Sequence, residues 1–420
     1  MWTIEAIFIG KLSAAALAGV SMAIQIILVF FAVLLTFVVG ASLIINRHLG
    51  AEQRYQANHI FGQAMMIGVF MALIFGFVWY TGAIHIFKLI KEAGTGSAQA
   101  AGITYLRTVA IFAPLLITNF VAVGIIRAVG DTKYSMFINV LINSINLVLS
   151  PLLIFGWLGC PRLEVKGSAL AVGIAHSIGF IITGVLLRSR KLQLFLSFRE
   201  MSRPRWNSFK ELFKTGLPTT VEQLTWALGQ LVVTGYAAGI YVTVLTTHAI
   251  LIRIQAVLSM VYMGFGLAAM SHMGKNLGAS ENALAEHTAK IAHRIMAVFV
   301  MVIVLVMITF SKALIHIFTT DPQTVALGRR VIYIFAFAQI PKALNNVLAG
   351  NLRGIGEVNW LMWTTIVFVI LFEIGFNWIA AFTLGWGLYG IWSIQTMDET
   401  VRLGLNYYRF GGGSWRAKRR

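Results

Sequence analysis

Charge is scarce in this 420-residue chain: only 11% of the residues are charged, whereas 58% are hydrophobic. In an average soluble domain about a quarter of the residues are charged. A soluble fold of this length could not hide so much apolar surface, so the scarcity of charge excludes an ordinary globular protein. The chain has instead long apolar runs, such as residues 21–45 and 60–79, which reach the roughly 20 residues needed to cross a bilayer.

These runs also lack the alternation of apolar and polar residues that marks the strands of a membrane β-barrel. Because the hydrocarbon region of a bilayer contains no water, each spanning segment must pair its own backbone groups, as a helix does. The composition therefore predicts an all-α polytopic membrane protein, which is in contact with membrane lipids.

Signatures of catalysis and of metal binding are missing as well. The single cysteine, Cys160, permits no internal disulfide bond, and the sequence has no nucleophile elbow, phosphate-binding loop or metal-spaced cluster of His and Cys. The N-terminus shows no cleavable signal peptide. We therefore expect no catalytic residue, no metal site and no cofactor, and a membrane-embedded enzyme is the least favoured function.

Eleven spans are expected after a short apolar segment at the start of the chain. They cover approximately residues 20–46, 60–84, 103–126, 135–158, 167–187, 213–236, 242–270, 295–318, 331–350, 360–384 and 386–404. The one long polar connection lies between the fifth and sixth of these spans, over residues 188–214.

The net charge of +18 comes from loops between the spans and not from one soluble face, so nucleic-acid binding is not expected. Most of the Lys and Arg residues lie on one side of the membrane, in the long connection, the C-terminal tail and alternate loops. The richer side faces the cytoplasm. We therefore expect a multi-pass protein of the plasma (inner) membrane with a cytoplasmic C-terminus.

The chain contains an internal repeat with a spacing of about 228 residues. Leu49-Gly50-Ala51 recurs as Leu277-Gly278-Ala279, and Arg127-x-x-Gly130-Asp131 recurs as Arg353-x-x-Gly356-Glu357. Further matches in the same order are Ile24-Gln25 with Ile254-Gln255, Tyr105 with Tyr333, Pro114 with Pro341, Asn146 with Asn377, and Gly167 with Gly387. Both copies place the Arg-x-x-Gly-acid motif on the cytoplasmic side, which indicates a parallel repeat, as in transporters whose two bundles rock against each other.

The repeat divides the chain into two six-helix bundles related by a parallel pseudo-twofold axis. The expected parts are an N-lobe over residues 1–190, a cytoplasmic linker over 191–212, a C-lobe over 213–404 and a basic cytoplasmic tail over 405–420.

Several motifs resemble those of the multidrug and toxic compound extrusion (MATE) family when they are taken as an ordered set. They are Ile7-Phe8-Ile9-Gly10, Leu49-Gly50-Ala51, Arg127-Ala128-Val129-Gly130-Asp131-Thr132, Gly216-Leu217-Pro218, Glu222-Gln223, Thr247-His248-Ala249-Ile250-x-x-Arg253-Ile254, Gly274-Lys275-Asn276-Leu277-Gly278-Ala279 and Leu352-Arg353-Gly354-Ile355-Gly356. The Glu-Gln pair and the stretch with His248 and Arg253 are most similar to the DinF-like branch. The resemblance implies twelve helices in two lobes and the export of organic cations or other amphiphiles in exchange for protons or sodium.

The chain departs from the family pattern at three positions. Glu5 stands where the family's first helix normally has an Asp, Ser150 stands where its fifth helix commonly has an acid, and Val172 replaces a usual Thr. The sequence also begins midway through the family's first helix, so that helix is expected to be truncated.

Ionisable side chains inside the membrane cost roughly 2.5–3.5 kcal/mol each on insertion scales, so each needs a reason. Glu5 is either a proton carrier or an interfacial residue near the chain start. Lys342 is expected to form an ion pair with either Glu222 or Glu373. This pair is either structural or part of ion coupling. Glu373 either neutralises Lys342 or lines the cavity, and Arg253 either lines it or bridges helices.

Polar residues of the fifth helix form a further candidate site. Asn146 and Ser150 are four residues apart and share a helix face. With Asn143, they either supply oxygens to a cavity or hold helices together.

The favoured function is a secondary antiporter that exports small organic molecules by alternating access and acts as a monomer. Sodium coupling is less favoured, because Lys342 stands where the sodium-coupled branch has an Asp, and a cation there would oppose sodium binding. A proton gradient is therefore the expected driving force, with Glu5 as first carrier and Glu222 or Glu373 as second. The alternative is a flippase for lipid-linked oligosaccharides or lipids, which should show a strongly cationic cavity.

Overall fold

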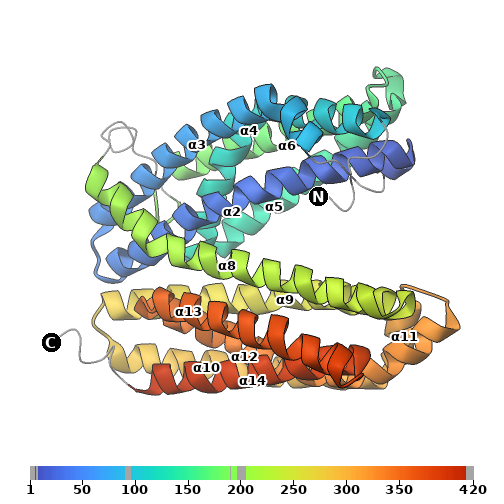
Figure 1. Cartoon of the computed structure of the whole chain (residues 1–420). Coiled ribbons are helices and arrows are strands. Elements are labelled where there is room, and N and C mark those ends of the chain that lie inside the picture. Colours follow the sequence, from blue (N-terminus) through green and yellow to red (C-terminus); the bar gives the residue numbers. More distant parts are fainter. Residues whose placement is uncertain (1–4, 6–7, 90–95, 190, 196–204, 413–420) are drawn as a thin grey trace. The chain divides into compact units, whose positions relative to one another are not determined.

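The computed structural model describes residues 5, 8–89, 96–189, 191–195 and 205–412, so parts of the expected linker and tail lie outside the described residues. Within these ranges the chain is almost entirely helical, and no strand occurs (Figure 1). The residues group into two compact units, Met1–Ile45 with Gln53–Gly216 and Asn46–Glu52 with Leu217–Arg420. The helix that begins at Trp206 contributes to both units.

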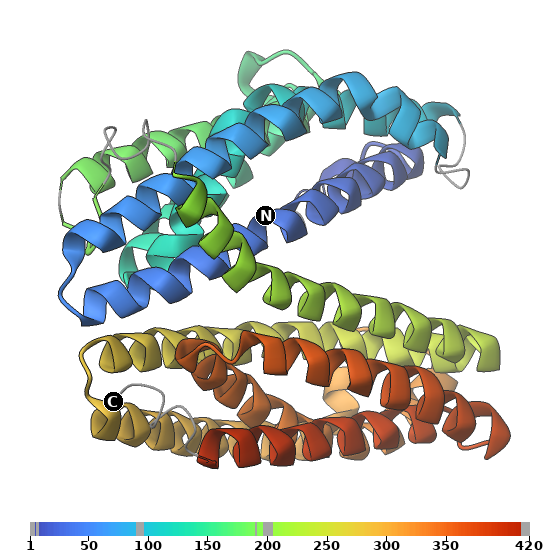
Figure 2. The same cartoon turned by 60° about the vertical axis from the view of Figure 1, so that its left-hand side comes forward.

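Unit 1 is built around one buried helix. Its described elements are α2 (Ala14–Gly50), α3 (Arg54–Leu89), α4 (Gly96–Ala128), α5 (Thr132–Phe155), η1 (Trp157–Gly159) and α6 (Glu164–Arg188). Of the first helix only Glu5 and residues 8–10 are described. Helix α4 contacts α3, α5 and α6, and Figure 2 shows α3 and α4 running alongside each other. Most of the side chains in the central part of α4 are buried.

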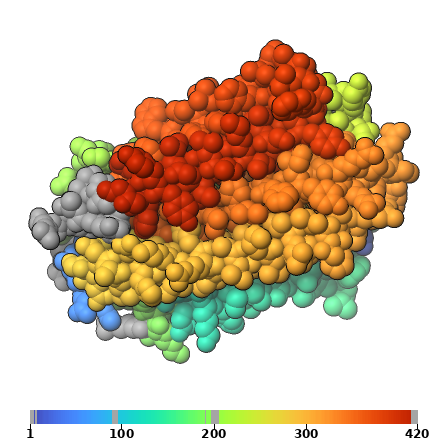
Figure 3. Space-filling model, turned by 90° about the horizontal axis from the view of Figure 1, so that it is seen from below, coloured from blue at the N-terminus to red at the C-terminus, as the bar shows by residue number. Residues whose placement is uncertain are grey.

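Unit 2 repeats this plan with α12 at its centre. Its described elements are α8 (Trp206–Ile240), α9 (Val242–Gly278), α10 (Asn282–Thr309), α11 (Ser311–His316), α12 (Pro322–Ile355), α13 (Val358–Phe368), η2 (Val369–Phe376), η3 (Ile379–Thr383) and α14 (Gly387–Gly411). Helix α12 packs against α9, α10 and α14. On the face shown in Figure 3, α10 (yellow), α12 (orange) and α14 (red) lie side by side.

Each of the eleven predicted spans lies in helical chain, and most of the helices are longer than the predicted span. The prediction of a single helix is wrong for residues 295–318, which cover α10 and α11, and residues 360–384 cover α13, η2 and η3. Apolar residues reveal only the part of a helix that crosses hydrocarbon, whereas the helix itself continues into the polar interface. Among the described residues nine helices are long and apolar enough to cross a membrane. Large apolar side chains such as Val29 and Phe70 are exposed on these helices, as lipid contact requires. The fold is an all-α polytopic membrane fold.

The sequence repeat is visible in the structure as equivalent helix ends. One pair of ends lies at Gly130 and Gly356, and the other at Gly50 and Gly278. Gly130 and Gly356 adopt positive φ angles of 101° and 91°, and each follows the Arg of its motif by three residues. The next residue closes the turn in both copies, since Asp131 N–H donates to the Ile126 carbonyl and Glu357 N–H to the Leu352 carbonyl. This is the Schellman arrangement that ends many helices, and it favours glycine at the left-handed position.

The Leu-Gly-Ala motifs lie at the ends of α2 and α9, and within unit 2 they pack on each other. A side chain at Gly50 would overlap the backbone carbonyl of Lys275, and one at Gly278 would overlap that of Arg47. Arg47 corresponds to Lys275 in the repeat, so the two contacts are equivalent. Glycine at both positions therefore allows two helix ends to approach at backbone distance.

Candidate functional site

Glu5 lies at the centre of a polar site in unit 1. Its side chain is completely buried, and it lies between α4 and α6. The Tyr105 hydroxyl donates a hydrogen bond of 3.0 Å to Glu5 Oε1, and the Ser168 hydroxyl donates to the same oxygen. The other oxygen, Oε2, has no hydrogen-bond partner among the described residues. The carboxyl group is thus held by one oxygen and has the second one free.

This geometry accommodates both protonation states of the carboxyl group. Two hydroxyl donors on Oε1 stabilise the carboxylate, because hydrogen bonds to a charged oxygen are the strong ones. A proton can be carried on Oε2 without displacing either donor. The expectation that Glu5 is an interfacial residue is not supported, since an interfacial carboxylate would face water.

The polar face predicted on α5 is present and is only partly satisfied. Asn146 and Ser150 are both buried, and neither Asn146 Nδ2 nor Ser150 Oγ has a hydrogen-bond partner in the described part of the chain. Asn143 is partly exposed, and its amide donates to the Asn139 carbonyl one turn earlier at 2.7 Å. The Asn143 amide is therefore used in a hydrogen bond within its own helix, whereas Asn146 Nδ2 and Ser150 Oγ remain available to other groups.

The level of Ser150 along the bundle follows from two contacts between α5 and α6. Gly167 of α6 packs on Leu153, and Gly179 packs on Ile142. The two helices are antiparallel, so Ser150 lies at the level between Ser168 and Val172 on α6. Ser150 is therefore close to the depth at which Glu5 is held.

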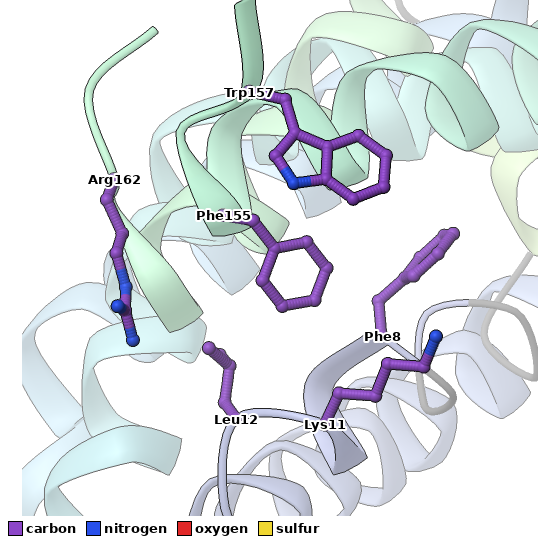
Figure 4. Close-up of a pocket in the computed structure, with 6 residues that line it drawn as sticks. All are labelled: Phe8, Lys11, Leu12, Phe155, Trp157 and Arg162. Carbon is purple, nitrogen blue, oxygen red and sulfur yellow. The ribbon is translucent and has the colours of Figure 1, made fainter.

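A second feature of unit 1 is a cavity of about 420 Å³ beside the end of the first helix (Figure 4). It is lined by Phe8, Lys11, Leu12, Phe155, Trp157 and Arg162. Phe155 stacks on Trp157 with ring centroids 5.8 Å apart. Arg162 pairs with Glu164 at 3.2 Å, and both side chains are exposed. Aromatic rings beside cationic side chains are typical of a membrane–water interface.

Unit 2 contains a smaller cavity of about 280 Å³ in which charged side chains gather. Its lining residues come from α8, α9, α12, α13 and α14, and they are Glu222, Gln223, Trp226, Ser259, Met263, Lys342, Asn345, Asn346, Ala349, Arg353, Thr365, Glu399 and Arg402. Arg253 is exposed on α9 and is not among them.

The cation of Lys342 is paired with an acid that the sequence did not single out. Lys342 Nζ lies 3.2 Å from Glu399 Oε1 and 5.7 Å from the centre of the Trp226 ring. Glu222 Oε1 instead lies 2.6 Å from an Arg353 nitrogen. The predicted pairing of Lys342 with Glu222 or Glu373 is therefore wrong. The physical reason is helix adjacency: α14 packs along α12 and brings Glu399 to Lys342.

A third ion pair completes the charged wall. Arg402 donates to both oxygens of Asp398, at 2.7 and 2.6 Å, and these two residues are one helical turn apart on α14. Asn345 donates to Glu399 at 3.1 Å and accepts from Asn406 at 2.8 Å. The spacing of Asp398 and Arg402 is a recognisable sequence signal for a helical ion pair, but the pattern of spans and loops places Arg402 in the cytoplasmic flank of the last span.

Glu373 occupies a separate position in unit 2. It is 3% exposed and lies in η2, a π-helical stretch. Gln230 donates to Glu373 Oε1 at 3.1 Å, and Oε2 has no partner in the part of the chain that the structure describes. Glu373 forms no ion pair with Lys342, whose partner is Glu399, so that predicted pairing is wrong. Glu373 is not among the residues that line the unit 2 cavity, and its role in lining a transport cavity stays a prediction. Its half-satisfied carboxyl group resembles that of Glu5, and π-helical turns often occur at functional sites.

Comparison with known proteins identifies the family. The MatE family model matches residues 1–152 and 218–379. The chain is 25% identical over 418 residues to a probable multidrug resistance protein NorM of Thermotoga maritima, which covers 97% of this chain and 87% of that protein. An FAD transporter of Shewanella oneidensis is 26% identical over 320 residues, which is 76% of this chain and 70% of that protein. A solved structure of MATE in complex with MaL6 matches with a TM-score of 0.88 at 19% identity, over 99% of this chain and 92% of that one.

The chain therefore belongs to the MatE family of multidrug and toxic compound extrusion transporters. It is a multi-pass membrane transporter.

Proposed function

We propose that the chain is a proton-driven antiporter that exports small organic cations, amphiphilic drugs or metabolites by alternating access. The observation that carries this proposal is the buried carboxyl group of Glu5, with two hydroxyl donors on Oε1 and none on Oε2. A carrier of protons must be stable in both protonation states, and this arrangement provides for both. The NorM relative supports drug export, and the FAD transporter supports export of a metabolite.

Sodium is the less favoured coupling ion. A sodium site requires several oxygen ligands in a fixed cage. In unit 2 the carboxylates of Glu222, Asp398 and Glu399 are each held by a cationic side chain at 2.6–3.2 Å. A sodium ion would have to displace that cation. Glu222 is thus a poor carrier, and Glu373, whose Oε2 is free, is the second choice after Glu5.

The flippase alternative requires an excess of positive charge for a pyrophosphate headgroup. The three cations that line the unit 2 cavity each face an acid, so the cavity offers no such excess. The charge balance favours the antiporter. We further propose that the transporter works as a monomer in the inner membrane, with its C-terminus in the cytoplasm.

Transport in everted vesicles tests the coupling directly. An imposed pH gradient alone should drive uptake of a cationic dye, and Glu5→Gln should abolish this uptake while leaving the protein folded. The matched control is Glu211→Gln, which alters an exposed acid on α8 and should leave uptake unchanged. Uptake that ignores the pH gradient and follows an imposed sodium gradient would overturn the proton assignment. Full uptake by Glu5→Gln would move the carrier to Glu373.

A further inference from the structure

The unit 2 cavity is balanced in charge, side chain by side chain. Lys342, Arg353 and Arg402 line it, and each is paired at 2.6–3.2 Å with Glu399, Glu222 and Asp398 respectively. The side chains in these pairs are at most 17% exposed. A ligand that brings one net charge into such a site leaves that charge without compensation, which is costly away from water.

The size of the cavity argues against a large ligand, and most of its lining residues carry polar groups. Pockets for drug-sized molecules usually measure about 300–1,000 Å³ and are mostly apolar, whereas this one measures about 280 Å³. Its apolar wall consists of Trp226, Met263 and Ala349, and the other ten lining residues are polar or charged.

The cavity also presents polar groups that are not used by the protein. The side chains of Gln223 and Ser259 line it without a hydrogen-bond partner among the described residues, and Gln223 is exposed. These two groups come from different helices, α8 and α9. They offer both donors and acceptors to a small ligand, whereas the ion pairs set its charge.

We infer that the unit 2 cavity binds a small polar zwitterion, a molecule that carries one ammonium and one carboxylate group. Its ammonium group would face the carboxylates of Glu222 and Glu399, and its carboxylate would face Arg353 and Arg402. A zwitterion adds no net charge, and each of its ends meets a group of opposite sign. The inference rests on the proposed transport function, because it selects the substrate class from the metabolites that such an exporter could carry.

Equilibrium binding to the purified full-length protein in detergent, with no ion gradient, tests this inference. The probes are L-glutamine, 4-aminobutanamide, which is glutamine without its carboxylate, and 4-carbamoylbutanoate, which is glutamine without its ammonium group. Isothermal titration calorimetry should show glutamine binding at least about tenfold more tightly than either single-charge analogue. Equal affinities for the three probes, or no measurable binding of glutamine by folded protein, would overturn the inference.

A charge substitution at the cavity wall locates the binding site. Gln223→Glu adds a negative charge without breaking any of the three ion pairs, so the preference should move toward 4-aminobutanamide and the glutamine advantage should fall about tenfold. Gln323→Glu, the same change at an exposed position at the start of α12, should leave the preference unchanged. An unchanged preference in Gln223→Glu would place glutamine elsewhere and overturn the site.

The two proposals can fail separately. Binding of glutamine is measured without a gradient, so it survives if proton coupling through Glu5 proves wrong. Conversely, pH-driven uptake of the dye that Glu5→Gln abolishes would stand even if the three probes bound equally well.

Discussion

Lys342 of α12 and Glu399 of α14 form an ion pair, with 3.2 Å between Nζ and Oε1, inside the transporter. The pair connects α12, the central helix of unit 2, to α14, its last helix. Asn345 and Asn406 extend the same link by hydrogen bonds toward the end of α14. A position that holds a carboxylate in the sodium-coupled branch, as the sequence resemblance implies, is here occupied by a cation that is paired with Glu399.

Removal of one partner of this pair should destabilise the protein strongly. Lys342→Met leaves Glu399 buried without a cation, and such losses cost about 3–5 kcal/mol. The double variant Lys342→Met with Glu399→Leu removes both charges and should recover most of the loss. Thermal unfolding in detergent measures both. A double variant as unstable as the single one would show that the charges themselves are not the cause.

The hydroxyl donors of Glu5 should set the pH dependence of transport. Tyr105 and Ser168 stabilise the carboxylate form by hydrogen bonds. In Tyr105→Phe or Ser168→Ala the protonated form is favoured, so the midpoint of the pH profile of uptake should move to higher pH. Ser177→Ala is the control, because the Ser177 hydroxyl donates only to the Gly173 carbonyl of its own helix. A midpoint that does not move in either donor variant would contradict this role of the hydroxyls.

Two glycines of unit 2 offer a matched test of backbone packing. Gly50→Ala would place a methyl group against the Lys275 carbonyl, and such overpacking costs about 1–3 kcal/mol. Gly264→Ala, at a helical position with open space around it, should instead stabilise α9 by about 0.5–1 kcal/mol. The thermal unfolding midpoints should therefore move in opposite directions. Equal shifts for the two variants would refute the close approach at Gly50.

Acid should weaken the protection of the first turn of α12 against hydrogen exchange. Asp321 caps this helix, and hydrogen bonds from Thr324 hold the pKa of its carboxyl below the ordinary value of 3.8. A lowered pKa means that the cap contributes fully above about pH 3.8 and is lost as the pH falls through the lower folded value. The rate of hydrogen exchange at the Thr324 amide, corrected for its intrinsic rate, should therefore rise as the pH falls through this value. Asp321→Asn retains the cap and should remove this pH dependence.

The single thiol tests the proposed sidedness. Cys160 lies in the connection between η1 and α6, is partly exposed, and is the only cysteine in the chain. A membrane-impermeant maleimide should label it in intact cells. In a Cys160→Ser background, Ala279→Cys introduces an exposed thiol at the end of α9, which should react only after permeabilisation. Labelling of the two thiols in the reverse order would invert the topology.

Local properties of the chain were predictable from sequence, because they depend on neighbouring residues. Apolar runs determined the spans, and the repeated Arg-x-x-Gly-acid motif marked equivalent helix ends, at Gly130 and Gly356. Glu5 was also recognisable as a candidate from its chemistry, since an acid in an apolar segment needs a reason, and the structure shows that it is buried.

Contacts between helices were not predictable, because they depend on which helices are neighbours. The partner of Lys342 required knowledge that α14 packs along α12, and the donors to Glu5 lie 100 and 163 residues away. The π-helical stretches between Val369 and Thr383 carry no sequence signal, since the segment reads as a uniform apolar run. Sequence alone therefore could not show that Glu373 lies in a π-helical turn beside Gln230.

The reciprocal contact of the two Leu-Gly-Ala motifs has a consequence for the history of the chain. After an internal duplication, most positions of the two copies are free to diverge independently. Gly50 and Gly278 are not, because each packs on backbone next to the other copy of the motif, and a larger residue in one copy displaces the other. Both positions are therefore expected to remain glycine, so the repeat should stay most recognisable at the place where its two copies touch.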